Sequence, residues 1–89
     1  MKFEWDEKKA ATNLEKHGVP FAYAARVFLD PERQDFVDDR KNYGEERRLT
    51  LGKIDGFILV ISYTLRDRLI RLISARKANQ RERKRYEEI

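Results

Sequence analysis

The sequence predicts an α+β fold made of two N-terminal helices, an antiparallel β-meander of three to four strands and a C-terminal helix. Apolar residues recur at helical spacing up to about residue 29, and between residues 34 and 77 they follow the patterns of strands. A helix-capping sequence then follows Ala78. Helices on either side of a run of strands must cover one face of the sheet, which is typical of the α+β class. At 89 residues, the chain is expected to form one domain over residues 1–89.

The first predicted helix covers Glu7–His17. Asp6 is a good N-cap, and Gly18 suits the position that follows a helix end. We expect the apolar stripe of this helix to comprise Ala10, Ala11 and Leu14.

The second predicted helix covers Phe21–Leu29. Pro20 fits its first position, and the pair Asp30-Pro31 ends it. Before both helices, Lys2–Trp5 alternates polar and apolar residues and could form a short strand.

Turn and cap residues divide the remainder of the chain. Asp55-Gly56 predicts a two-residue type I′ hairpin turn, because such a turn needs positive φ at both positions. Asn79 followed by Glu82 predicts a capping box for the last helix. The predicted strands are Gln34–Asp38, Arg47–Ile54, Phe57–Leu65 and Leu69–Lys77. The expected core aromatic residues are Trp5, Phe57 and Tyr63.

Positive charge is concentrated in one segment. Residues 66–85 hold nine Lys or Arg against two acidic residues, a net charge of +7, whereas residues 1–65 carry a net charge of −1. A cationic patch beside a neutral remainder suggests a polyanionic partner. The alternative is a solvated face laced with salt bridges.

The composition limits the chemistry that the chain can perform. It has no Cys and one His, so neither a disulfide framework nor a multi-histidine metal cluster is possible. We expect no metal and no cofactor. There is no apolar run long enough to span a membrane, and the N-terminus does not resemble a signal peptide. The absence of Cys fits a reducing compartment, and we expect a cytoplasmic protein.

Three segments together resemble the BrnT toxins. They are FEWDEKKAATNLEKHGVPF near the start, GEERRLTLGKIDG in the middle and VISYTLRDRLIRLISARKANQRERKRYEE at the end. The resemblance implies a RelE-like ribonuclease toxin of a type II toxin–antitoxin system, one that inhibits translation. One departure is Arg48, where relatives more often carry an apolar or aromatic residue.

The resemblance also implies the partners. It implies an antitoxin of the BrnA-like, ribbon-helix-helix DNA-binding kind, which would neutralise the toxin in a two-fold heterotetramer. Operator DNA would be bound only through this antitoxin, and the toxin itself would bind RNA.

RNA can be cleaved without a metal when its 2′-hydroxyl attacks the neighbouring phosphorus. This reaction needs a base, cationic donors for the phosphorane and an acid for the leaving oxygen. Arginine suits the donor role because its planar fork binds phosphate with two hydrogen bonds.

Each catalytic candidate also has a structural explanation. Arg47 and Arg76 would bind the scissile phosphate; the alternative for Arg47 is a salt bridge at the end of its strand. Glu46 could orient Arg47 or take a proton. His17 could be the general base, because the ordinary pKa of histidine lies near neutrality, yet it also suits the end of a helix. Tyr86 is either a proton donor or a tyrosine that packs the last helix on the sheet.

The remaining basic side chains are candidates for RNA binding, with a solvated surface role as the alternative. They are Arg48, Arg66, Arg71, Lys77, Arg81 and Arg85. A non-catalytic module that binds nucleic acid or a partner protein through the same surface is the alternative function. The chain lacks an aromatic RNA-recognition run and a helix-turn-helix, which disfavours that alternative.

Overall fold

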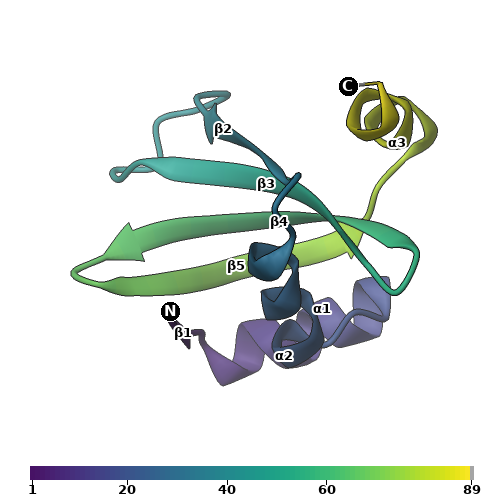
Figure 1. Cartoon of the computed structure of the whole chain (residues 1–89). Helices are drawn as coiled ribbons and strands as arrows, with labels where there is room; N and C mark the ends of the chain where they lie inside the picture. Colours follow the sequence, from purple (N-terminus) through teal and green to yellow (C-terminus); the bar gives the residue numbers. More distant parts are fainter. Residues whose placement is uncertain (89) are drawn as a thin grey trace.

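The computed structural model describes residues 1–88 and contains a five-stranded sheet flanked by helices (Figure 1). The elements are β1 (Lys2–Glu4), α1 (Glu7–His17), α2 (Phe21–Ala24), the 3₁₀ helix η1 (Ala25–Leu29), β2 (Gln34–Asp38), β3 (Arg47–Ile54), β4 (Phe57–Arg66), β5 (Leu69–Lys77) and α3 (Gln80–Glu87).

The predicted arrangement of two N-terminal helices before a purely antiparallel meander is wrong. The sheet is mixed, with the order β1-β5-β4-β3-β2, because β1 precedes α1 and pairs parallel with β5. Phe3 explains the pairing: it lies opposite Ile70, and its ring centroid is 5.4 Å from that of Phe28 in the core. A strand of three residues whose partner lies more than 60 residues away leaves no local pattern from which the pairing can be predicted.

The caps of α1 are confirmed, but its predicted stripe is wrong in part: Ala10 packs against the core, whereas Ala11 is exposed. The Asp6 carboxylate accepts hydrogen bonds from two backbone N–H groups of the first turn, and Gly18 has φ of 70°. Leu14, however, is 49% exposed, whereas Asn13 is buried. The helix therefore presents a polar side chain to the sheet, for a reason given below.

The second predicted helix is divided in two. It begins at Phe21 with Pro20 as N-cap, and after Ala24 it tightens into η1. The buried residues Phe21, Ala24 and Val27 recur every three residues, which matches the three residues per turn of a 3₁₀ helix. Gly52 lets η1 approach β3, because a Cβ at this glycine would lie 2.5 Å from a methyl carbon of Val27.

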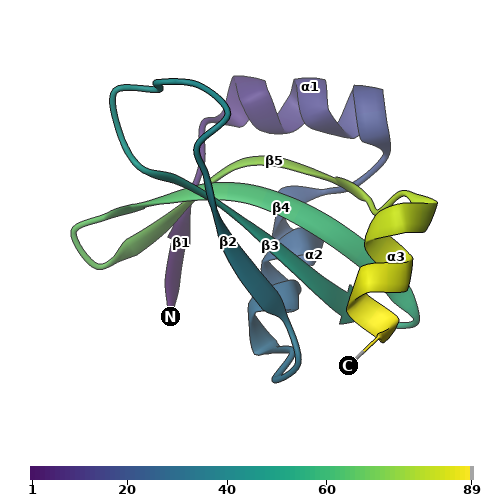
Figure 2. The same cartoon turned by 90° about the horizontal axis from the view of Figure 1, so that it is seen from above.

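The two faces of the sheet are covered differently. The helices α1, α2 and η1 pack on one face, where the core includes Val27, Ile61, Leu72 and Ala75 (Figure 1). On the opposite face, α3 lies over the end of the sheet near the β3–β4 turn, and the rest carries no helix (Figure 2). Tyr86 anchors α3 there, among the buried side chains of β3 and β4.

The β3–β4 turn has the predicted geometry, with φ of 51° at Asp55 and 84° at Gly56. Tyr63 is buried and Trp5 packs against the core, as expected, whereas Phe57 is 50% exposed and is not a core residue. Within residues 1–88, no helix is long and apolar enough to cross a membrane.

Candidate functional site

Strand register places a group of polar side chains on the sheet face that α1 and η1 do not cover. Arg47 pairs with Asp38 on β2, Thr64 pairs with Arg71 on β5, and Arg71 pairs with Glu4 on β1. Nearer α3, in successive rows of the sheet, Ser62 pairs with Ser74 and Val60 pairs with Arg76. We call this surface the open face; its polar members are Glu4, Asp38, Arg47, Ser62, Thr64, Arg71, Ser74 and Arg76.

Arg47 is held in place without using its hydrogen-bond donors. Its guanidinium lies 4.0 Å from the centre of the Tyr43 ring. Its Nε is buried and has no hydrogen-bond partner, and no carboxylate of residues 1–88 lies within salt-bridge distance. A buried donor without a partner is rare in proteins and needs an explanation. Since this Nε has almost no exposed surface, a ligand would instead meet the terminal nitrogens of the guanidinium, which form no ion pair with residues 1–88.

Arg76 lies on the same face but is engaged with an acidic residue. Its two terminal nitrogens donate to the two carboxylate oxygens of Glu82 at 2.7 and 2.9 Å. This pairing raises the pKa of Arg76 and lowers that of Glu82. The same carboxylate accepts a hydrogen bond from the Asn79 N–H at 2.9 Å, which completes the predicted capping box. Glu82 therefore joins the start of α3 to the open face.

A second ion pair borders Arg47. Arg40 donates to both oxygens of Asp38 at 2.8 and 2.9 Å, and the hydroxyl of Tyr43 donates to Asp38 at 3.2 Å. The bonds from Arg40 outweigh burial and lower the pKa of Asp38 to about 2. Sequence reasoning missed both residues, although an acid and an arginine two positions apart at the end of a strand are a recognisable signal.

The other predicted RNA-binding residues are dispersed. Arg71 pairs with Glu4 at 3.1 Å on the open face, and Arg66 pairs with Glu45 at 3.3 Å near the β4–β5 turn. The guanidinium of Arg85 lies 4.1 Å from the centre of the Phe36 ring, and the amine of Lys77 lies 5.3 Å from that of Phe57. Arg81 is exposed on α3.

Arg48 is on the covered side of the sheet, because it follows Arg47 along β3 and side chains alternate between faces. Its guanidinium donates to Asp35 at 2.7 Å and to Glu46 at 3.3 Å, and the bond to Asp35 raises its pKa. Asp35 also accepts a hydrogen bond of 2.5 Å from Tyr63. These bonds give Arg48 a structural role that requires no ligand.

The backbone of Glu46 borders the open face, but its carboxylate lies toward the covered side, where it pairs with Arg48. It directly precedes Arg47, its side chain is exposed, and its backbone carbonyl accepts a hydrogen bond of 2.8 Å from Thr64. One carboxylate oxygen of Glu46 accepts a hydrogen bond from Arg48, and the other accepts no hydrogen bond from residues 1–88.

His17 and Tyr86 are apart from the two arginines. His17 is exposed at the end of α1 and borders a hollow over the edge of β5. Tyr86 is buried, and its hydroxyl donates to Asp30 at 2.5 Å. Burial and then this hydrogen bond raise the pKa of Tyr86 to about 12.

Asp30, which sequence reasoning did not single out, fixes α3. Besides Tyr86, its carboxylate accepts hydrogen bonds from the backbone N–H groups of Glu32 and Lys53. Burial opposes ionisation of Asp30, but these bonds outweigh it and lower the pKa.

Asn13 closes the free edge of β5. Beyond residue 71, β1 no longer pairs with this strand. The side-chain amide of Asn13 donates to the Ala75 carbonyl at 2.9 Å and accepts from the Ala75 N–H at 3.0 Å. It also donates to the Val19 carbonyl at 3.1 Å. The available sequence signal for this contact was Asn13 itself, a polar residue next to Leu14 in the predicted helix.

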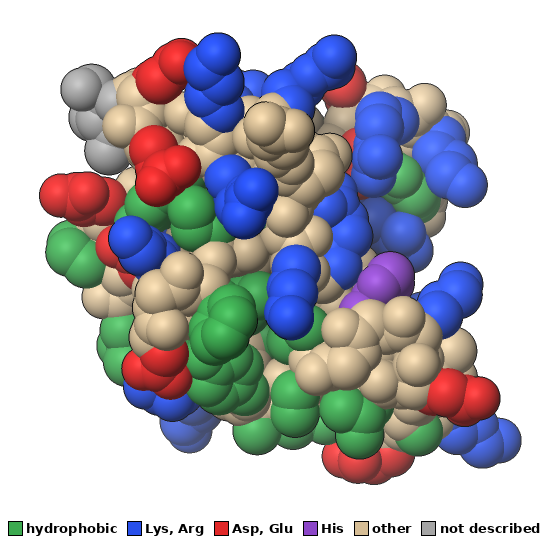
Figure 3. All heavy atoms as spheres, turned by 90° about the vertical axis from the view of Figure 1, so that its right-hand side faces the viewer, with side chains coloured by type: hydrophobic (Ala, Val, Ile, Leu, Met, Phe, Trp, Pro, Cys, Tyr) green, Lys and Arg blue, Asp and Glu red, His purple; other side chains and the backbone are tan. Residues whose placement is uncertain are grey.

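The surface at the α3 end of the sheet is predominantly basic. Seen from the side of the β3–β4 turn and α3, Lys and Arg side chains gather around a central hollow, and most acidic side chains lie at the margins (Figure 3). Among residues 1–88, no group of three or more His, Asp or Glu side chains is placed to hold a metal ion.

Comparison with known proteins places the chain in a family. The model of the family described as ribonuclease toxin, BrnT, of type II toxin-antitoxin system matches residues 5–82. A search of curated proteins gives no match.

Proposed function

Because the chain belongs to the BrnT family of ribonuclease toxins of type II toxin–antitoxin systems, we propose that its open face cleaves RNA in the cytoplasm without a metal ion and so inhibits translation. The observation that carries this proposal is the guanidinium of Arg47, which lies on the open face, stacks on Tyr43 and forms no ion pair with residues 1–88. Arg47 and Arg76 lie on one face and both have guanidinium groups that fit phosphate.

In the proposed reaction, the 2′-hydroxyl of the RNA attacks the adjacent phosphorus. The bond from the 2′-oxygen to phosphorus forms and the bond to the 5′-oxygen breaks. The products are a 2′,3′-cyclic phosphate and a 5′-hydroxyl. Arg47 and Arg76 donate hydrogen bonds to the non-bridging oxygens, whose negative charge grows in the transition state. Arg76 exchanges all or part of its pairing with Glu82 for the phosphate.

The proton transfers are assigned by accessibility. Glu46 takes the proton of the 2′-hydroxyl once its carboxylate turns from Arg48 toward the open face. It directly precedes Arg47, it is exposed, and one carboxylate oxygen receives no hydrogen bond from residues 1–88. Tyr86 remains a candidate for the acid, and His17, predicted as an alternative base, could also donate a proton when it is protonated. Each has a structural role, His17 at the end of α1 and Tyr86 in the bond to Asp30. Tyr86 must leave its buried position to act.

Cleavage of single-stranded RNA in excess EDTA tests the proposal. We expect products that end in a 2′,3′-cyclic phosphate, detected by mass spectrometry. Strong inhibition by Arg47→Ala in the same assay would identify the open face as the source of activity. Activity that appears only after a divalent metal is added would contradict the mechanism.

Membership of the family implies an antitoxin partner. We propose that it is a ribbon-helix-helix protein, that it covers the open face, and that the complex is a two-fold heterotetramer that binds operator DNA through the antitoxin. Arg47, Arg71 and Arg76 give an acidic antitoxin segment cationic partners on this face. Hydrogen exchange should show protection of β5 and α3 on complex formation. Protection confined to α1 and α2 would contradict occlusion.

A further inference from the structure

The phosphate-binding end of Arg76 is already occupied by a carboxylate of the chain. The two terminal nitrogens of Arg76 donate to the two carboxylate oxygens of Glu82 at 2.7 and 2.9 Å. Two parallel hydrogen bonds of this kind are also the way in which a guanidinium binds the oxygens of a phosphate. At this arginine, Glu82 therefore takes the place of the ligand that the open face is proposed to bind.

This contact distinguishes Arg76 from the other two arginines of the open face. Arg71 donates to Glu4 from one terminal nitrogen, at 3.1 Å. Arg47 forms no ion pair with residues 1–88. A polyanion that reaches the open face therefore meets free terminal nitrogens on no side chain but Arg47 without first disturbing an ion pair of the described chain.

The carboxylate of Glu82 is fixed beside Arg76. The oxygen that accepts from Arg76 at 2.7 Å also accepts from the Asn79 N–H at 2.9 Å, and the Glu82 N–H donates to the Asn79 side chain at 2.8 Å. Further along α3, Tyr86 is buried and donates to Asp30. Hydrogen bonds from Arg76 lower the pKa of Glu82, so the carboxylate stays ionised near neutral pH. Because turning Glu82 away would break the capping box, its negative charge remains at the site when a polyanion arrives.

A phosphate can approach Arg76 in two ways, and Glu82 opposes both. A phosphate that binds the two terminal nitrogens must replace the carboxylate. A phosphate that binds Nε and one terminal nitrogen lies next to the carboxylate, and the two negative charges repel each other. The charge of Glu82 therefore lowers the affinity of this site for phosphate in either geometry.

We propose that Glu82 competes with RNA for Arg76, as an autoinhibitory contact that limits how tightly the open face holds the phosphate backbone. The inference rests on the proposed function and adds to it a residue that sets the affinity for RNA. The competing interpretation is that Glu82 orients Arg76 for the substrate. In that case, loss of the carboxylate does not tighten RNA binding, whereas competition predicts that it does.

The test removes the charge of Glu82 and keeps its cap. Glutamine also completes a capping box, so Glu82→Gln retains a side-chain oxygen for the Asn79 N–H. Binding is measured by fluorescence anisotropy with an eight-nucleotide RNA whose 2′-oxygens are methylated, so that it cannot be cleaved. We expect the Kd of Glu82→Gln to fall by about two- to fivefold, the equivalent of a partly exposed ion pair.

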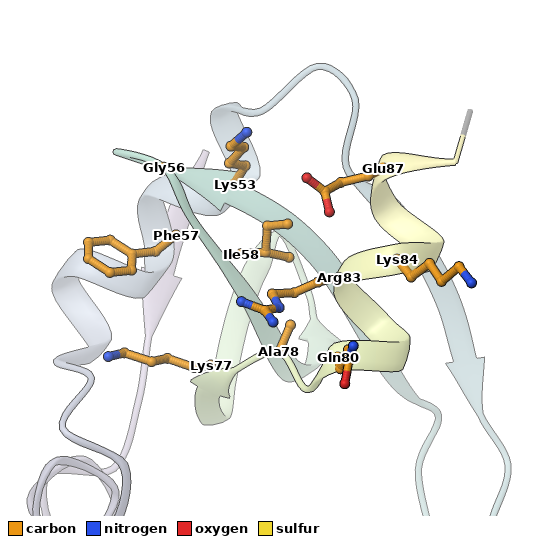
Figure 4. Close-up of a pocket in the computed structure, with 10 residues that line it drawn as sticks. All are labelled: Lys53, Gly56, Phe57, Ile58, Lys77, Ala78, Gln80, Arg83, Lys84 and Glu87. Carbon is orange, nitrogen blue, oxygen red and sulfur yellow. The ribbon is translucent and has the colours of Figure 1, made fainter.

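Glu87→Gln is the matched control, because it removes the same charge from the same helix. Glu87 is exposed and forms no ion pair with residues 1–88. It points from α3 over a groove that Lys53 and Ile58 also line (Figure 4). We expect its Kd to change much less than that of Glu82→Gln, because salt screens exposed charges that do not contact the ligand. Thermal melting of both variants checks that they are folded.

The outcomes separate this inference from the proposed function. Tighter binding by Glu82→Gln, with little change in Glu87→Gln, supports the inference even if no RNA is cleaved. Equal gains in the two variants would show a general effect of charge, and unchanged or weaker binding by Glu82→Gln would show an orienting role; either result overturns the inference. Absence of octamer binding in every variant also overturns it. Cleavage of RNA by the wild type in EDTA, measured separately, leaves the proposed function standing in all of these cases.

Discussion

The two faces of the sheet share their strands but use their arginines differently. Arg48, on the covered face, donates to two carboxylates, and one of these also accepts from Tyr63. Arg47, on the open face, stacks on Tyr43 and leaves a buried donor without a partner within residues 1–88. Because side chains alternate between the two faces along β3, one of two adjacent arginines is a structural candidate and the other is a functional candidate.

The difference shows how a small fold can keep a reactive surface. On the covered face, burial requires that polar groups be satisfied, so Asn13 and Asp35 are fully engaged. On the open face, water can satisfy the polar groups that it reaches until a substrate replaces it; the buried Nε of Arg47 is not among these groups. Donors that have no protein partner are then available for phosphate.

Replacing Arg76 with Ala should produce the largest effect on the open face. Removing a donor that acts in the transition state costs about 3–4 kcal/mol, so cleavage should fall by about 100- to 1,000-fold. Rates on a defined RNA measure this, with Arg68→Ala, at an exposed position of the β4–β5 turn, as the control. Arg76→Lys should recover only part of the activity, because the fork geometry is lost. Full activity of the Ala variant would return Arg76 to a purely structural pairing with Glu82.

Replacing Asn13 with Leu should instead affect the fold. The change removes three hydrogen bonds and leaves the Ala75 N–H and carbonyl without partners at the edge of β5. We expect a loss of about 3 kcal/mol in the free energy of unfolding. Thermal or urea unfolding measures it, with Thr12→Ala as the control at an exposed neighbour. An unchanged stability would show that water closes this edge as well as Asn13 does.

A smaller effect should appear in acid. The pKa of Asp38 is lowered to about 2 from its ordinary 3.8. A lowered pKa in the folded state stabilises the protein above the pKa of the unfolded state, and this contribution is lost as the pH falls through the folded value. The free energy of unfolding should therefore fall between about pH 4 and pH 2. In Asp38→Asn, the part of this fall due to Asp38 should disappear; an identical pH profile in the variant would contradict the assignment.

Local sequence patterns predicted much of the structure. The strands from β2 to β5, the type I′ turn and the caps at Asp6, Gly18 and Asn79 follow from spacing and turn chemistry. The parallel pairing of β1 with β5 was not predictable, since it depends on residues more than 60 positions apart. The buried Asn13 was missed because helical periodicity assigns apolar side chains to the core and cannot anticipate an amide that pairs with a strand edge.

The candidate site was predictable to about the same extent as the fold. Chemistry identified Arg47 and Arg76 as phosphate-binding candidates. The sequence could not show that Arg48, with the same side chain one position later, lies on the other face with Asp35 as its partner. The pairing of Arg76 with Glu82 was also hidden, because Glu82 was expected to act only as a cap.

Comparison of Arg47→Ala with Arg48→Ala is the most direct test of the difference between the faces. We measure the cleavage rate on one RNA in EDTA and the free energy of unfolding for both variants. Arg47→Ala should lose about 100- to 1,000-fold in rate, by the same transition-state argument as Arg76, with little change in stability. Arg48→Ala should retain most of the rate but lose about 1–3 kcal/mol of stability, because Asp35 loses a hydrogen-bond partner. Equal losses of rate in the two variants, or the reverse pattern, would contradict the assignment of the open face as the cleavage site.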